Sequence, residues 1–531
     1  MTQGTRRPEV PATGRADRAA LVGLLLATAT VGISSTSVVA ALPVVLADLH
    51  GTQAQYGWMI GVTLLAAAAS GPVWGKIAEF WPLRRLILVA LGIFVLGSAL
   101  AGTAPTPEAL IGLRVIQGVG VGGVFGLGPV VLGLALPGEQ RSRWLNYFTG
   151  AQTSATLAGP IIGGGVLAVG LSWRWTFYVG VPVALLATVL LRSLDVRARP
   201  RAHRRTDIAG FLLVPATLAV LLVAVTLLAG DAHRGLGLAL GGTALVLAAV
   251  TVVVEVRAPD PVLAGRLFRR LETAAALLAS AVVGLVMGVG FYLTQYLQVA
   301  RGLSALESSL WSLPLVGATL LTGLLAGRRI SVTRRYRGWL IAGAAAIALG
   351  TTVLSQTVGH GTLPAVAVLI GVIGFGFGCL QQNLVVAAQN SAPTDDLVAA
   401  TSTATFLRTT GGAVASPLMA IVMAAALEPR LAAATSLPGG TDLDTGHLPD
   451  LAALVPAVAT AVQEAYAESF GVLLVAHIPM AVLLVVCVLL TRNRPFVTAP
   501  GGPVAGAPTD RTPRGGHPPA QQARHTAADP G

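Results

Sequence analysis

Long apolar runs, separated by short charged stretches, follow one another along almost the whole chain. A helix needs roughly 20 apolar residues to cross the hydrocarbon core of a bilayer. Runs of suitable length without Asp, Glu, Lys or Arg are 19–47, 49–75, 86–107, 115–138, 144–173, 208–230, 235–254, 273–300, 308–327 and 469–491. A further run, 338–394, is long enough for two crossings. Barrel strands would appear as shorter alternating segments, so the pattern predicts membrane-spanning helices.

Fourteen transmembrane helices follow from this pattern, which predicts an all-α polytopic membrane protein. Their expected limits are 19–45, 54–76, 86–105, 108–132, 144–168, 175–192, 208–229, 235–255, 273–298, 307–327, 338–357, 363–388, 398–426 and 467–491. The thirteenth is interrupted by Arg408, and the sixth is short.

The composition agrees with a membrane environment. Charged residues make up 11% of the chain, against roughly 25% in soluble domains, and hydrophobic residues make up 54%. The net charge of +12 does not indicate nucleic-acid binding, because most basic residues gather in alternate loops and near both termini. This distribution follows the positive-inside rule, which places both termini in the cytoplasm. We therefore expect a multi-pass protein of a cell membrane, such as a bacterial inner or plasma membrane.

Two loops share a spacing of glycine and arginine. Gly75 begins the loop after the second predicted helix, and Arg85 lies ten residues beyond it. Gly327 begins the loop after the tenth, and Arg337 lies ten residues beyond it. The spacing is compatible with chance, but as a true repeat it indicates two related halves, an architecture in which substrates bind between the repeats.

The fourth predicted helix carries Arg114, Gln117, Gly118 and Gly120. Three- and four-residue spacing places Arg114, Gln117 and Phe125 on one face. An arginine in a membrane helix is costly unless it faces protein or water. We expect this face to look into the bundle, where Arg114 either locks the packing or has a proton-linked role.

The fifth predicted helix contains Gly159, Pro160, Gly163 and Gly164. Gly159 and Gly163 form a pair of small residues that lets a neighbouring helix approach closely. Pro160 lacks a backbone donor and favours a bend, which could serve as a pivot between two halves of the bundle. Tight packing alone is the alternative interpretation.

With these motifs the chain resembles the major facilitator superfamily, and in particular its 14-helix drug:proton antiporter branch. The helix-four and helix-five motifs match the patterns R-x-x-Q-G-x-G and G-P-x-x-G-G of that branch, and 172–177 matches as well. The matching positions in the family's loop between helices two and three are Gly75, Glu79, Arg84 and Arg85. Phe80 and Pro82 depart from the loop pattern, so the latch that this loop forms in the family is expected to be altered.

The resemblance implies two six-helix lobes plus two additional transmembrane helices. The expected parts are a cytoplasmic N-terminal tail, the first lobe, the additional pair with its linker, the second lobe and a disordered cytoplasmic tail, at 1–18, 19–192, 193–255, 256–491 and 492–531. The second lobe is expected to include an acidic extracellular loop at 428–465.

Other motifs do not support a cofactor, metal or catalytic site. The glycines at 118–123 spell a dinucleotide-binding pattern, but they lie in an apolar helix where packing explains them better. Lys76 is followed by Ile77, so the chain lacks a phosphate-binding loop for ATP. Cys379 and Cys487 lie inside apolar runs and indicate neither a disulfide framework nor a metal site. We expect no enzyme activity.

Taken with the resemblance, these features favour a monomeric secondary transporter that exports small amphipathic compounds, such as drugs or antibiotics, in exchange for protons. Candidate cavity residues are Ser34, Thr36, Phe125, Gln295, Gln298, Gln381, Asn383 and Arg408, and candidate proton-coupling residues are Asp48, Glu79 and His477. Ser34 stands where the family's first helix often has an acid, and no predicted helix has an acid at its centre. Neutral or anionic substrates are therefore expected. Export or symport of a single metabolite, or a membrane-embedded sensor or enzyme, are the alternatives.

Overall fold

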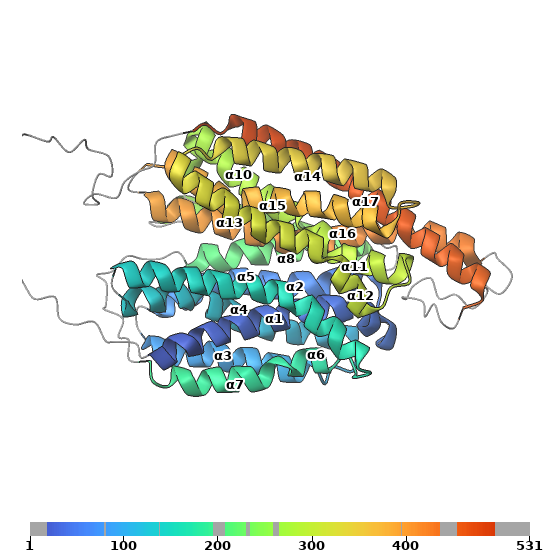
Figure 1. Ribbon diagram of the computed structural model, residues 1–531, viewed down its shortest axis with the longest axis horizontal. Helices are drawn as coiled ribbons and strands as arrows, with labels where there is room; N and C mark the ends of the chain where they lie inside the picture. Colours follow the sequence, from blue (N-terminus) through green and yellow to red (C-terminus); the bar gives the residue numbers. More distant parts are fainter. Residues whose placement is uncertain are drawn as a thin grey trace, which may run out of the picture. The chain divides into compact units, whose positions relative to one another are not determined.

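The computed structural model describes residues 18–78, 81–136, 138–194, 208–229, 234–258, 265–393, 396–435 and 454–493. Almost all of both predicted tails, together with Glu79 and Phe80, lies outside these residues. Every regular element within them is a helix (Figure 1). This agrees with the apolar pattern, because a helix satisfies its own backbone hydrogen bonds in lipid.

The described residues of the first half of the chain form nine α-helices. They are α1 (Arg18–Asp48), α2 (Gln53–Ile77), α3 (Leu83–Ala101), α4 (Pro107–Ala135), α5 (Gly138–Ala168), α6 (Trp175–Tyr178), α7 (Gly180–Leu191), α8 (Ile208–Ala229) and α9 (Arg234–Arg257). The short α6 and α7 follow one another and together take the place of the sixth predicted helix.

The second half begins with the short 3-10 helix η1 (Gly265–Arg269). The elements that follow are α10 (Leu271–Val286), α11 (Gly288–Gln295), the π-helix η2 (Tyr296–Ala300), α12 (Ala305–Trp311), α13 (Leu313–Thr333), α14 (Arg337–Thr357), α15 (Leu363–Ser391), α16 (Leu397–Thr435) and α17 (Pro456–Leu490). Successive elements α10, α11 and η2 make one crossing, and α12 and α13 make another.

Each of the fourteen predicted crossings has a helical counterpart. In the described part of the chain, 11 helices are long and apolar enough to cross a membrane, and Trp175–Leu191 and Ala216–Val225 are shorter apolar helices. The helix α5 is the remaining counterpart, with 31 residues. The predicted all-α fold is therefore confirmed.

Several helix limits differ from those predicted. α5 begins at Gly138 instead of 144, and α16 and α17 extend to Thr435 and back to Pro456, so both helices enter the predicted loop 428–465. The prediction ended helices where apolar runs ended, whereas a helix that projects beyond the bilayer continues through polar residues. An ion pair between Arg430 and Glu468, with 2.9 Å between Nε and Oε2, joins the extension of α16 to α17.

The helices pack as two six-crossing lobes of the kind expected. In the first, α1 packs on α5 and α7, and α4 packs on α2 and α3. In the second, α15 packs on α13 and α14, and α10 packs on α16 and α17. The lobes meet where α2 packs on α16 and α5 on α12, and the additional helix α8 contacts both α2 and α16 (Figure 1). The exact residue limits proposed for the lobes stay a prediction.

Candidate functional site

Two glutamine side chains join the lobes where α2 begins and α11 ends. Gln53 Nε2 donates to Gln295 Oε1 at 2.9 Å, and Gln295 Nε2 donates back to Gln53 Oε1 at 2.7 Å. Gln295 is fully buried. Each amide therefore satisfies the other, which makes the contact favourable only while the lobes are together at this end.

A tyrosine pair and a serine extend this contact along α2. Tyr56 Oη donates to the Phe291 carbonyl at 2.9 Å, and its ring lies 5.2 Å from that of Tyr292. Ser416 of α16 donates to the Gly57 carbonyl at 3.0 Å. Gly57 permits this approach, because a Cβ there would lie 2.6 Å from the Ser416 carbonyl oxygen.

Two further hydrogen bonds tie α1 and α5 to the second lobe. Gln298 Nε2 donates to the Ala40 carbonyl of α1 at 2.8 Å and to Ser308 Oγ at 3.1 Å. Ser309 Oγ of α12 donates to the Pro160 carbonyl of α5 at 2.9 Å. The proline of the helix-five motif thus lies at the junction between the lobes.

The glycines of the helix-five motif face different partners. A Cβ on Gly159 would collide with Thr36 of α1, and one on Gly163 would collide with the Ser37 backbone of the same helix. A Cβ on Gly164 would lie 2.6 Å from the Ala305 carbonyl oxygen of α12, across the lobe junction. The motif therefore allows close packing inside the first lobe and between the lobes.

The helix-four glycines bring α4 against its neighbours within the first lobe. A Cβ on Gly118 would lie 2.5 Å from the Thr63 carbonyl oxygen of α2, and one on Gly120 would lie 2.5 Å from the Phe94 nitrogen of α3. These contacts agree with the packing interpretation of the glycine-rich stretch.

Arg114 and Gln117 are buried inside the same lobe. Arg114 Nε donates to the Met59 carbonyl of α2, and its guanidinium lies 5.9 Å from the centre of the Phe177 ring. Gln117 Nε2 donates to Ser98 Oγ of α3 at 2.9 Å. Arg114 Nη1 and Gln117 Oε1 are buried without a hydrogen-bond partner among the described residues. The helix-four face looks into the bundle as predicted, but toward neighbouring helices of its own lobe.

The motif in the loop between the second and third predicted helices begins at the end of α2, away from the Gln53–Gln295 contact at its start. Arg84 Nη1 donates to the Arg192 carbonyl at 3.3 Å, within the first lobe, and the Arg85 side chain is exposed. Nothing lies within 4 Å of a Cβ built on Gly75. Glu79 is outside the described residues.

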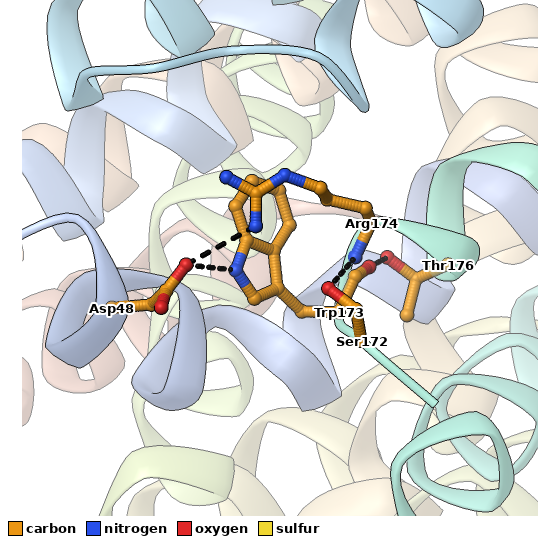
Figure 2. Close-up of polar contacts among 5 residues, drawn as sticks. All are labelled: Asp48, Ser172, Trp173, Arg174 and Thr176. Atoms are coloured by element: carbon orange, nitrogen blue, oxygen red, sulfur yellow. Dashed lines mark hydrogen bonds and ion pairs between the residues drawn. The ribbon is translucent and has the colours of Figure 1, made fainter. Parts of the chain in front are cut away.

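Asp48 ends α1 and is paired with the segment before α6 (Figure 2). Its Oδ2 accepts from Trp173 Nε1 at 2.7 Å and from Arg174 Nη1 at 3.2 Å. The Arg174 guanidinium also lies over the Trp173 ring, 4.3 Å from its centre. The 172–177 string thus binds this carboxylate at the end of the helix.

Three candidate residues lie on α15 and α16 of the second lobe. Arg408 Nη1 donates to the Gln381 carbonyl at 3.4 Å, while Gln381 Nε2 contacts Met287 Sδ at 3.9 Å. Asn383 is buried and donates to the Cys379 carbonyl of its own helix at 2.7 Å.

Of the other candidates, Ser34 is buried against Gly180 of α7, and Phe125 packs on the apolar core of the first lobe. His477 is buried in α17, where Nδ1 lies 2.8 Å from the Leu473 carbonyl oxygen. Its Nε2 has no hydrogen-bond partner in the described structure. Ser34 and His477 therefore lie away from the contacts that join the lobes.

The two-lobe arrangement can be compared with known proteins. The sequence profile of the Major Facilitator Superfamily matches residues 24–416. The chain belongs to the Major Facilitator Superfamily. It is 31% identical over 496 residues to an uncharacterised MFS-type transporter of Mycobacterium tuberculosis, covering 90% of this chain and 69% of that one. It is 29% identical over 409 residues to an efflux pump of Gibberella moniliformis, covering 73% and 71%.

A solved structure of the same fold is a bacterial homologue of the human lysosomal transporter Spinster. The TM-score is 0.64 at 13% sequence identity, over 88% of this chain and 96% of that chain. This similarity concerns the fold alone, and it agrees with the two-lobe arrangement described above.

Several residues at the lobe junction were not anticipated from this transporter's sequence. Gln53, Tyr56, Ser309 and Ser416 are uncharged and lie near helix ends or inside apolar runs. A polar residue at a helix end is usually solvated, so only the fold identifies these as contacts between lobes. Gln295 and Gln298 are among the predicted cavity residues because they are polar side chains of the ninth predicted helix.

Proposed function

We propose that the chain exports small amphipathic organic compounds in exchange for protons, by alternating access between its two lobes. The proposal depends on where the polar contacts between the lobes lie. Every hydrogen bond described between the lobes joins the end of α1, the start of α2 or the second half of α5 to α11, η2, α12 or α16. Toward the opposite end, described contacts such as Arg84 with Arg192 and Arg266 with Asp396 stay within one lobe. Closure at one end is what a rocking transporter requires.

The loop charges suggest which side this closed end faces. If both termini are cytoplasmic, as the arginine distribution favours, the closed end lies outside the cell and substrates enter from the cytoplasm. Relatives that include an efflux pump, and the helix-five motif of antiporters, support export over uptake.

The substrate is proposed to be neutral or anionic. The described residues deep in the lobes include the basic side chains Arg114 and Arg408, whereas Asp48 lies at the end of its helix and is paired with Arg174. A buried cation without a nearby carboxylate disfavours a cationic ligand by repulsion in a medium of low dielectric.

Protons are the proposed driving ion. Each proton that moves inward down 100 mV provides about 2.3 kcal/mol, which sustains a gradient without ATP. Asp48, Glu79 and His477 remain the proposed coupling residues. Neutral variants Asp48→Asn, Glu79→Gln and His477→Gln distinguish them, because only loss of the coupling group removes the dependence of export on the proton gradient while binding is retained.

Susceptibility profiling of cells that express the chain tests the proposed function. We expect raised resistance to a set of neutral or anionic compounds, lost when an uncoupler collapses the proton gradient and lost with Arg114→Ala. Equal export of ethidium-type cations and neutral compounds in inverted vesicles would contradict the substrate proposal. Accumulation of the compounds in intact cells would indicate symport.

A further inference from the structure

A basic cavity lies in the second lobe, apart from the contacts that join the lobes. It has a volume of about 530 Å³ and opens between the start of α10, the start of α14 and the end of α17. Its charged lining consists of Arg270, Arg337, Arg492 and Glu272. Arg337 is also the arginine that the spacing of Gly327 and Arg337 singled out, and the proposed transport mechanism gives it no role.

The charge of this cavity favours an anion. Three arginines face one carboxylate, and the Arg492 Nε to Glu272 Oε1 distance of 3.9 Å leaves that ion pair loose. Arg337 Nη2 donates to the Leu489 carbonyl at 3.2 Å, while Arg337 Nε is buried without a hydrogen-bond partner in the described structure. A buried guanidinium donor of this kind is costly to leave unpaired, and a phosphate oxygen would satisfy it.

Two helix N-termini add to the positive electrostatic potential of the cavity. α10 begins at Leu271 and α14 at Arg337, and neither has a hydrogen bond from its N-cap side chain. The Arg337 amide of α14 donates to Asn493 Oδ1 at 3.0 Å, so the positive ends of the helix dipoles, together with the remaining first-turn amides, attract anions. The cavity therefore combines fixed dipoles with arginine side chains.

An apolar rim surrounds the charged floor. Leu271 is 66% exposed, and Leu489 and Leu490 of α17 are 48% and 42% exposed. Farther along α17, Val482 and Val486 continue an exposed apolar surface. A free anion gains nothing from such a rim, whereas acyl chains would cover it.

We propose that this cavity binds the phosphate group of an anionic phospholipid. Arg270, Arg337 and Arg492 contact the phosphate, and the leucine rim contacts the first carbons of the acyl chains. Basic pockets between transmembrane helices on the cytoplasmic side are suited to such head groups. The proposed ligand is a lipid of the surrounding membrane, so the site is independent of the substrate that the protein transports.

Native mass spectrometry of the purified full chain in a neutral detergent tests the proposal. Phosphatidylglycerol is titrated against the wild type, the single variant Arg492→Gln and the double variant Arg270→Gln/Arg492→Gln. Each arginine near an anionic lipid surface strengthens binding about fivefold. The single variant is therefore expected to weaken lipid binding about fivefold and the double variant about 30-fold. The Arg492 side chain is 78% exposed, so its replacement leaves the fold intact.

Three controls decide the result. The variant Arg269→Gln/Arg329→Gln removes the same charge from exposed positions outside the cavity and should bind like the wild type. Phosphatidylcholine should bind at least tenfold more weakly than phosphatidylglycerol, because only the latter bears a net charge. Unchanged binding by the double variant, or equal losses in the control variant, would overturn the proposal. Complete competition by inorganic phosphate would do the same, since it would identify a free anion as the ligand.

Discussion

At the scale of single residues, the contact between the lobes depends on uncharged polar side chains. The amides of Gln53 and Gln295 each donate and accept one hydrogen bond with the other, at 2.9 and 2.7 Å. Interhelical hydrogen bonds contribute about 0.6 kcal/mol on average and up to about 1.7 kcal/mol in a membrane protein, small enough to be broken in every transport cycle. An ion pair between lobes in a dry site would be harder to separate and reform.

Replacement of one amide should open this end of the transporter. Gln295→Leu leaves the Gln53 amide without its partner, and we expect the closed state to lose about 1.4 kcal/mol, a tenfold shift. Ser416→Cys, in a chain with Cys379 and Cys487 replaced by alanine, reports the change, because position 416 is fully buried at the junction. Its maleimide labelling should become about tenfold faster.

The double variant Gln53→Leu/Gln295→Leu is the matched control for this pair. Two apolar side chains leave no amide unsatisfied, so labelling should return most of the way to the wild-type rate. If Gln53→Leu, Gln295→Leu and the double variant all label equally fast, the two amides do not interact energetically.

At this scale, only some of the contacts between residues could be predicted from the sequence. Gln295 and Gln298 could be identified as cavity candidates, and the structure places both at the junction, with Gln53 and Ala40 as partners. Ser34 was a candidate because it stands where the family often has an acid, yet it packs on α7. A side chain's place in a helix indicates its face, but which neighbour that face meets depends on how the helices assemble.

At the scale of helices, α5 carries three consecutive glycines with different surroundings. Gly163 meets the α1 backbone inside the first lobe, Gly164 meets α12 across the junction, and nothing lies within 4 Å of a Cβ on Gly165. The motif therefore combines a requirement of lobe folding with a requirement of lobe closure.

Alanine substitutions should separate these two requirements. Gly163→Ala is expected to lower the melting temperature in detergent, since a backbone collision within a lobe costs about 1–3 kcal/mol. Gly164→Ala should instead leave the melting temperature within a few degrees of wild type and speed labelling at Ser416→Cys, because its Cβ meets the other lobe.

Gly165→Ala serves as the control for this series. Alanine favours the helix over glycine by about 0.5–1 kcal/mol, so this variant should be neutral or slightly stabilising. A melting temperature lowered equally by all three substitutions would show that the contacts of Gly163 and Gly164 are not the cause.

Helix existence was predictable and helix limits were less so. Apolar length identified every crossing, because lipid admits few alternatives to a helix. It did not identify the break at Met287, the π-helix Tyr296–Ala300 or the extensions of α16 and α17. Arg301 shows the reason: it bonds Tyr296 Oη at 2.6 Å and the Val358 and Gly361 carbonyls at 2.9 and 2.8 Å, contacts that only the assembled lobe provides.

At the scale of the whole molecule, the proposed alternating-access mechanism requires that the lobes separate at the closed end during transport. The additional helix α8 contacts both α2 and α16, so it lies against both lobes. Rigid lobes that rock about their interface expose a central site to one side at a time. Transport and separation of Gln53 from Gln295 are then the same event.

A reversible cross-link tests this coupling directly. Gln53→Cys/Gln295→Cys, joined by a short cleavable bis-methanethiosulfonate reagent in the background without Cys379 and Cys487, should hold the closed end shut. We expect gradient-driven export to fall to the background level in proteoliposomes and to recover when the linker is reduced.

The control Arg430→Cys/Glu468→Cys joins α16 to α17 within the second lobe, where the native side chains form an ion pair at 2.9 Å. Its cross-link should leave transport unchanged, because no rearrangement between lobes separates these helices. Export at the uncross-linked rate by the first variant, with the linker shown to be intact, would mean that the lobes need not part at this end.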